Sequence, residues 1–122
     1  MNGLMMDWPL LIPCIMRRAA QFFADKEIVS RYGDGSLHRM NYGELDRRVR
    51  RLMNVLTRLG VKPGDRVATF AWNHHRHLEL YFAVPAVGAV LHTINIRLPR
   101  EQISYIINHA EDRLIFVDKS VA

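Results

Sequence analysis

The order of apolar segments in the second half of the chain constrains its fold more than any other feature of the sequence. Three short apolar stretches are expected to form buried strands, and two helical stretches separate them. The strands are expected over 66–71, 89–94 and 113–118. The helices are expected from about 74 or 75 to 87 and over 99–109. Short apolar strands that alternate with helices are typical of a parallel sheet with right-handed crossovers. The sequence therefore predicts an α/β fold with a β-α-β-α-β unit over about 66–118.

The first half of the chain predicts a helix, a β-hairpin and a second, longer helix. Ile15–Phe23 is expected to form the first helix. Two segments of alternating residues flank Gly33-Asp34-Gly35, and an Asp-Gly turn between such segments indicates a β-hairpin, here over about 26–41. Asn41 and Glu44 have the spacing of a capping box, so the long helix is expected to begin after Asn41.

The long helix is amphipathic and is expected to end at Gly60. Its buried face is expected to carry apolar residues at intervals of three and four: Leu45, Val49, Leu52, Met53, Leu56 and Leu59. Its opposite face carries four arginines: Arg47, Arg48, Arg51 and Arg58. Such a face is usually solvated, and we expect the same of this arginine face. Contact with acidic groups of a larger protein and contact with phosphate are the alternatives.

Composition and charge narrow the class of protein only in part. The 122 residues are 49% hydrophobic and 24% charged, which is typical of one globular domain spanning 1–122. The net charge of +5 is compatible with nucleic acid, an anionic membrane surface or phosphorylated small molecules, and equally with a basic piece of a larger protein. Cys14 is the single cysteine, so no internal disulfide can form and a cytoplasmic location is expected. The longest apolar run, 81–91, is too short for a transmembrane segment, and no secretory signal is recognisable.

The segment WNHHRHLE, which follows the first strand of the α/β unit, places three histidines within four positions. On a helix, His74 and His77 share one face and His75 points to another. Zinc and iron need three convergent ligands, although His92 on the next strand could add one. The sequence therefore favours an ordinary polar helix start, capped by Asn73, over a metal site.

The chain carries no recognisable catalytic motif. Its seven glycines are scattered, and none forms the GxGxxG or GxxxxGK loop that brings backbone N–H groups to phosphates. A nucleophile elbow and the cysteine pairs of a zinc site are also missing from the sequence. Trp8 and Trp72 are expected to be packing anchors rather than platforms for stacking on bases. We therefore predict no catalytic residue, no metal and no bound cofactor for these 122 residues, and no nucleic acid as partner.

A series of short motifs runs in order along nearly the whole chain. They are Asp7–Leu10, Tyr42–Leu45, Leu59–Val61, Pro63–Ala68, Trp72–Glu79, Tyr81–Ala83, Gly88–Thr93, Asn95–Leu98 and Ile107–Asp112. Together they resemble the opening of fatty-acid–CoA ligases, the acyl-CoA synthetases of the adenylate-forming superfamily. Ile96 departs from the family, which usually has proline there, and isoleucine frees the local φ angle.

The resemblance implies what a complete enzyme of this family does. Such an enzyme uses ATP and Mg2+ to convert a fatty acid into an acyl-adenylate, and the thiol of coenzyme A then attacks the adenylate to give the thioester. A Ser/Thr/Gly-rich loop, an acidic residue for the ribose and a lysine of a mobile C-terminal domain do this work, and in the family all three lie downstream of the region matched here. The resemblance thus implies an incomplete first lobe of an adenylate-forming enzyme. This lobe is expected to be inactive alone, with the remainder of the enzyme as its partner and a homodimer as a further possibility.

The carboxyl ends of the expected parallel strands are the place to look for a substrate contact, since open α/β sheets bind ligands there. Asn73 and His77 follow the first of these strands and Asn95 follows the second, so these three are the predicted substrate-binding residues. One alternative is a free-standing oligomerisation or binding module that uses the edges of the sheet. A basic nucleic-acid-binding domain, with affinity that falls steeply with salt, is the less favoured alternative.

Overall fold

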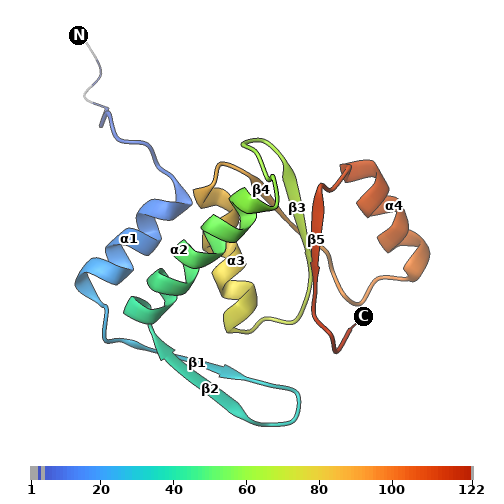
Figure 1. Cartoon of the computed structure of the whole chain (residues 1–122), viewed down its shortest axis with the longest axis horizontal. Helices are drawn as coiled ribbons and strands as arrows, with labels where there is room; N and C mark the ends of the chain where they lie inside the picture. Colours follow the sequence, from blue (N-terminus) through green and yellow to red (C-terminus); the bar gives the residue numbers. More distant parts are fainter. Residues whose placement is uncertain (1–2, 4, 122) are drawn as a thin grey trace.

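The computed structural model describes residue 3 and residues 5–121, and it has the α/β architecture predicted from the sequence (Figure 1). A two-stranded antiparallel hairpin precedes a three-stranded parallel sheet with strand order β4-β3-β5. The elements in chain order are α1 Ile12–Phe22, β1 Glu27–Arg31, β2 Leu37–Asn41, α2 Tyr42–Arg58, β3 Arg66–Phe70, α3 His75–Ala86, β4 Val90–Thr93, α4 Arg100–Ala110 and β5 Leu114–Val117. The largest boundary error is in α1, which begins at Ile12 rather than Ile15 because Pro13 fits the first turn of a helix.

The order of the strands places helices on both faces of the parallel sheet. The connection from β3 to β4 runs in one direction, and the connection from β4 to β5 passes back over β3. Two right-handed crossovers in opposite directions require their helices to lie on opposite faces. Figure 1 shows this arrangement, with α1, α2 and α3 on one side of the sheet and α4 on the other.

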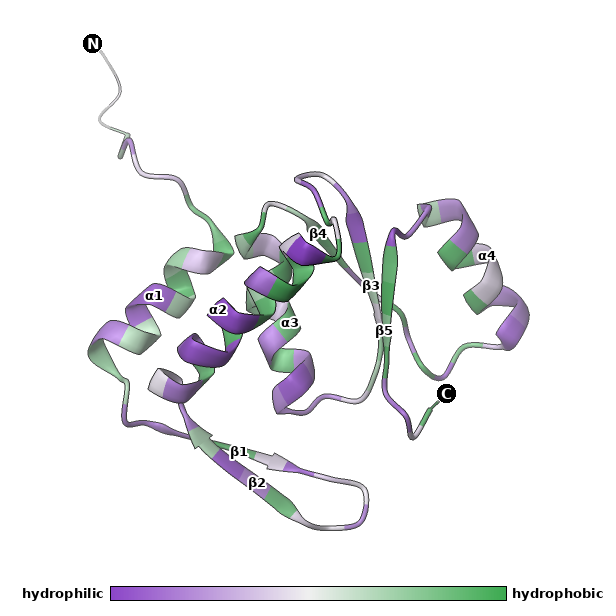
Figure 2. Ribbon diagram, viewed as in Figure 1, coloured by the Kyte–Doolittle hydropathy of each residue, from purple (hydrophilic) through white to green (hydrophobic). Residues whose placement is uncertain are grey.

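The core lies between the parallel sheet and the three helices α1, α2 and α3. The largest fully buried side chains come from α2, β3 and α3: Leu45, Leu56, Val67, Thr69 and Val84. In Figure 2, α2 is striped with hydrophilic and hydrophobic residues, whereas β5 is almost wholly hydrophobic. Only the central strand, β3, has a buried interior, so the prediction of three buried strands is wrong for β4 and β5. These two lie at the edges of the described sheet, where Val90 and Val117 are half-exposed.

The predicted start of α2 is confirmed, whereas the prediction for its arginine face is wrong at one position. Asn41 Oδ1 accepts a hydrogen bond from the Glu44 N–H at 2.8 Å and caps the helix. The other three arginines of the face are exposed. Arg48 is half-buried, and its Nε donates to Glu79 Oε1 on α3 at 2.7 Å. The expectation that the polar face of an amphipathic helix is solvated considers one helix alone, so it could not predict an ion pair with Glu79 on a different helix.

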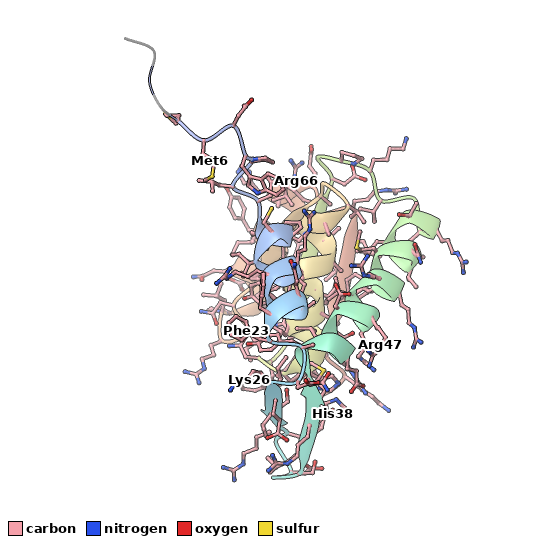
Figure 3. All side chains as sticks on the ribbon, turned by 90° about the vertical axis from the view of Figure 1, so that its left-hand side faces the viewer. Met6, Phe23, Lys26, His38, Arg47 and Arg66 are labelled. Atoms are coloured by element: carbon pink, nitrogen blue, oxygen red, sulfur yellow. The ribbon has the colours of Figure 1, made fainter. Side chains whose placement is uncertain are left out.

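The two tryptophans do not fill the core, so their predicted role as packing anchors is wrong. Trp8 is 53% exposed and Trp72 is 48% exposed. Trp8 lies on the segment that precedes α1, where Met5 and Met6 are also exposed. Figure 3 shows Met6 at the opposite end of the molecule from the hairpin that carries His38. Trp72 instead follows β3, where the chain reaches the carboxyl edge of the sheet.

Candidate ligand pockets at the carboxyl edge of the sheet

The carboxyl ends of β3 and β5 lie side by side at a topological switch point. From β3 the chain goes to β4 on one side, while β5 lies on the other side of β3. Open α/β sheets bind ligands in the crevice that such a divergence leaves. The residues that follow these two strands, 71–74 and 118–120, therefore line the edge at which a ligand is expected.

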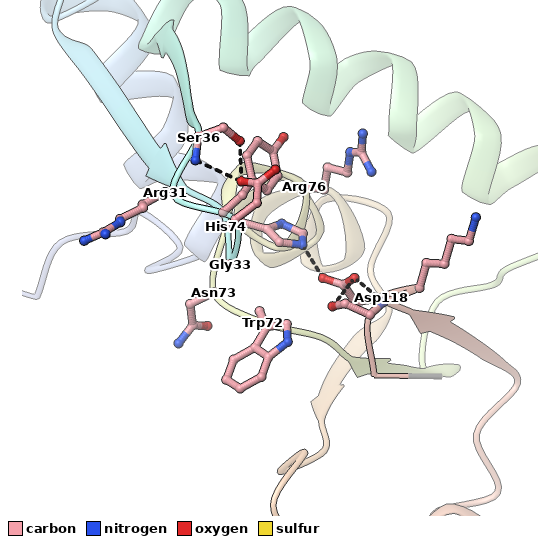
Figure 4. A pocket seen from close by; sticks show the side chains of 12 residues that line it. Arg31, Gly33, Ser36, Trp72, Asn73, His74, Arg76 and Asp118 are labelled. Carbon is pink, nitrogen blue, oxygen red and sulfur yellow. Dashed lines mark hydrogen bonds and ion pairs between the residues drawn. The ribbon is translucent and has the colours of Figure 1, made fainter.

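A pocket of about 1070 Å³ lies at this switch point, and we call it the switch-point pocket. Figure 4 shows that its walls come from three segments far apart in the sequence. These are the hairpin turn around 31–36, the start of α3 around 72–76, and the residues after β5, 118–120. The sequence did not predict that the hairpin turn lines this pocket, because no local pattern indicates that a turn about 40 residues upstream of α3 folds back onto the edge of the sheet.

His74 joins two walls of the switch-point pocket and corrects the prediction that Asn73 caps α3. His74 is the N-cap, and its Nδ1 accepts from the His77 N–H at 3.4 Å. Its Nε2 donates to Asp118 Oδ2 at 2.7 Å, which ties the start of α3 to the end of β5 (Figure 4). The helix begins one residue later than the Asn73 prediction requires, since His74 itself has the extended backbone of a cap.

Asp118 is held in its charged form by the groups around it. The pKa of its carboxyl group is lowered from 3.8, first by the Ser120 backbone N–H and further by the His74 imidazole and the Ser120 hydroxyl. The Ser120 N–H and hydroxyl both donate to Asp118 Oδ1, at 3.0 and 2.9 Å. The turn after β5 is therefore anchored to the same carboxylate that binds His74.

A second pocket of about 430 Å³, the strand-end pocket, lies between the carboxyl ends of β3 and β4. The structure brings all three predicted substrate-binding residues, Asn73, His77 and Asn95, to its lining. His77 is buried, and its Nε2 lies 2.9 Å from Thr69 Oγ1. Burial lowers the pKa of His77, which favours a neutral imidazole. Asn95 Oδ1 accepts from the Arg97 N–H at 3.0 Å.

The histidine triplet does not converge on a common point. His74 binds Asp118, His77 pairs with Thr69, and His75 Nδ1 lies 3.4 Å from the Tyr32 hydroxyl. Within residues 3 and 5–121, no group of three His, Cys, Asp or Glu side chains is arranged to hold a metal ion. Within the same residues, no helix combines the length and apolar character that crossing a membrane requires.

The glycines with positive φ angles do not form a phosphate-binding loop. Gly60 follows α2, Gly64 precedes β3 and Gly88 precedes β4, so all three lie at the amino edge of the sheet, away from the two pockets. Gly35 lies in the hairpin turn. A phosphate loop needs such residues between the carboxyl end of a strand and the start of a helix. The glycines of residues 3 and 5–121 therefore do not form a loop that would fit the triphosphate of ATP.

The fold and its pockets define the class of this protein as a doubly wound parallel α/β unit with two pockets at the carboxyl edge of its sheet. A family model described as AMP-binding enzyme matches residues 16–122, and the chain belongs to this family.

Named relatives and solved structures agree with this family. The chain is 53% identical over 117 residues to a long-chain-fatty-acid–CoA ligase of Thermus thermophilus, and 50% identical over 118 residues to a 3-methylmercaptopropionyl-CoA ligase of Ruegeria lacuscaerulensis. These alignments cover 96% and 97% of the chain, but the chain spans only 22% of the length of each relative. It superposes on a fatty acyl CoA synthetase of Mycobacterium tuberculosis with a TM-score of 0.79 at 26% identity, covering 92% of this chain and 22% of that one. For the inhibitor-bound N-terminal domain of FACL13 from the same organism, the TM-score is 0.77 at 26% identity, and 92% of this chain and 28% of that one are covered.

Proposed function

We propose that this chain forms the first lobe of an ATP-dependent fatty-acid–CoA ligase. The observation that carries the proposal is the 53% identity to the Thermus thermophilus long-chain-fatty-acid–CoA ligase across 96% of the chain. The complete enzyme would join a fatty acid to AMP, release diphosphate, and then transfer the acyl group to the thiol of coenzyme A. The 45% identity to a medium-chain-fatty-acid–CoA ligase of Ectopseudomonas oleovorans leaves the length of the acyl chain open. We place the reaction in the cytosol, because a chain with one cysteine, Cys14, suits a reducing compartment.

Within that enzyme, the chain would serve as a scaffold and as part of the surface that faces the substrate. The strand-end pocket supports this role, because Asn73 and the amide of Asn95 present hydrogen-bonding groups at the edge where open α/β sheets bind ligands. His77 would contribute shape and a fixed hydrogen bond to Thr69 rather than a positive charge, since its burial favours the neutral form. We therefore propose Asn73, His77 and Asn95 as substrate-contact residues.

ATP chemistry would come from parts of the enzyme other than these 122 residues. The sequence lacks a Ser/Thr/Gly-rich loop, and Gly60, Gly64 and Gly88 lie at the amino edge of the sheet, away from both pockets. The chain alone is therefore expected to show no ATP binding in a calorimetric titration with MgATP, with the complete Thermus thermophilus ligase as the positive control. Micromolar ATP binding by the 122 residues would contradict this division of labour.

The proposal can be tested directly by sequencing the gene beyond codon 122. A continuous reading frame that encodes a Ser/Thr/Gly-rich loop and a downstream lysine-bearing domain is the expected result. That frame could then be expressed and assayed for diphosphate release with fatty acids of different lengths. A stop codon immediately after Ala122 would instead support a free-standing module.

One observation favours such a module as the second candidate. Both outer strands of the described sheet, β4 and β5, have an unpaired edge, and Val90 and Val117 on them are half-exposed. Unpaired edges are sites at which another chain can add a strand, so a homodimer would be the simplest product. Sedimentation velocity at several concentrations would distinguish the two candidates, because a clean monomer at high concentration excludes pairing of these edges between copies.

A further inference from the structure

Two stacked imidazoles form a contact between the hairpin and α3. His38 of β2 stacks on His75, the first residue of α3, with ring centroids 3.9 Å apart and ring planes at 22°. The Tyr32 ring meets the same His75 ring edge-on at 5.9 Å, and its hydroxyl lies 3.4 Å from His75 Nδ1. We call Tyr32, His38 and His75 the histidine joint. His75 is 3% exposed, and His38 Nε2 is buried without a hydrogen-bond partner among the described residues.

The groups around the histidine joint disfavour a positive charge on it. Arg48 of α2 and Arg76 of α3 face His75, as do the neighbouring imidazoles of His38 and His74. The carboxylates nearby already have partners: Glu79 binds Arg48 at 2.7 Å, and Asp118 binds His74 at 2.7 Å.

Glu44 lies one turn before Arg48 on α2, and its negative charge helps to raise the pKa of Arg48. A proton on His75 would therefore meet burial and cations without a free carboxylate to offset them. Burial and then these cations lower the pKa of His75 from 6.5 to about 4.

The histidine joint also sets the position of one wall of the switch-point pocket. The hairpin turn that lines this pocket, including Arg31, Gly33 and Ser36, connects the two strands that the joint holds against α3 (Figure 4). We propose that the histidine joint is an acid-labile hinge: protonation of His75 releases the hairpin from α3 and opens the switch-point pocket. The inference concerns this chain's own geometry and does not depend on the proposed ligase activity.

The direction of the pH dependence follows from the preference of the docked hairpin for neutral imidazole. A pKa that falls from 6.5 to about 4 means that the docked form binds the proton about 300-fold more weakly than a free side chain. Docking is therefore fully stabilised above pH 6.5 and loses stability as the pH falls, so that the released population has risen about 160-fold at pH 4 and approaches a rise of about 300-fold only below pH 4. Asp118 stays mostly ionised in this window because its pKa is lowered from 3.8, so the tie between α3 and β5 is expected to persist while the hairpin moves.

An NMR titration of the whole chain from pH 7 to pH 4 tests the proposal. The expected result is progressive loss of the contact between the His38 and His75 ring protons, with shifts of the amide signals of β1 and β2, as the pH falls from 6.5 towards 4. The signals of the central strand β3 should not move. A hairpin that stays docked at pH 4, or a single transition in which β3 unfolds together with the hairpin, would overturn the proposal.

Three variants make the test specific to the joint. His75→Phe and His75→Leu fill the position with an apolar side chain that cannot be protonated, so the hairpin is expected to remain docked at pH 4. Two substitutions are used so that one variant is informative if the other fails to fold. His109→Phe is the control, because His109 is an exposed residue of α4 that stacks on Tyr105, and its transition should match that of the unsubstituted chain. Release of the hairpin at an unchanged pH in the folded His75→Phe or His75→Leu chain would show that the joint is not the switch.

Discussion

The ion pair between Arg48 and Glu79 should contribute more to stability than any other charged contact between the described helices. The Glu79 side chain is 10% exposed and the Arg48 side chain is 35% exposed, with 2.7 Å between Nε and Oε1. Loss of one partner from a fully buried ion pair costs about 3–5 kcal/mol, because the other charge is left without compensation. Water can reach the Arg48 side of this pair, which reduces the penalty. We therefore expect Arg48→Met to lower the free energy of unfolding by roughly 2 kcal/mol.

Urea denaturation at pH 7, followed by circular dichroism, measures this loss. Arg50→Met is the matched control: Arg50 lies on the same helix and pairs with Asp46 at 2.8 Å, but its side chain is 70% exposed, so its loss should cost less than about 1 kcal/mol. The double variant Arg48→Met with Glu79→Leu removes both charges, and it should recover most of the stability lost in Arg48→Met. Equal losses in Arg48→Met and Arg50→Met would refute the reasoning, since the burial of Glu79 would then have no energetic consequence.

Three further predictions concern backbone and local contacts. Gly88→Ala should lower the free energy of unfolding, measured by urea denaturation, by roughly 1–3 kcal/mol, because Gly88 has a φ of +79° and a Cβ there would lie 3.2 Å from Pro63 Cβ. Gly33 has open space around it, so Gly33→Ala should be nearly neutral. Asn41→Ala should cost about 1 kcal/mol through loss of the α2 cap, whereas Asn54→Ala, at an exposed position within α2, should cost nothing measurable. Asp118→Ala should cost about 1 kcal/mol at pH 7 by thermal unfolding. This difference should shrink as the pH falls through and below 3.8, because a carboxylate with a lowered pKa stabilises the fold only while it is ionised.

Local patterns in the sequence were sufficient to predict the elements and their order. The Asp-Gly turn, the Asn41 cap and the alternation of strands with helices each depend on residues within a few positions of one another. The features that were missed depend on distant partners. Arg48 meets Glu79 31 residues later, and His74 meets Asp118 44 residues later.

The choice of His74 over Asn73 as the cap illustrates why such features escape a local pattern. Asparagine is among the preferred N-cap residues and histidine is not, so local sequence favours Asn73. The contact with Asp118 favours His74 instead, because it fixes the His74 ring beside the end of β5. The candidate site residues were easier to place, since the carboxyl ends of parallel strands meet at one edge once the strand order is known.

The solitary position of α4 has a consequence for how the molecule opens in solution. Of the helices in the described part of the chain, only α4 covers its face of the sheet, and none of its residues from 100 to 110 is fully buried (Figure 1). Segments with little buried surface exchange their amide hydrogens through local opening, at a lower free energy than the whole molecule requires. Native-state hydrogen exchange should therefore find α4 exchanging well before α2 and β3, which share the core. The two faces of one sheet would then open on separate timescales, one by local fluctuation and the other only by global unfolding.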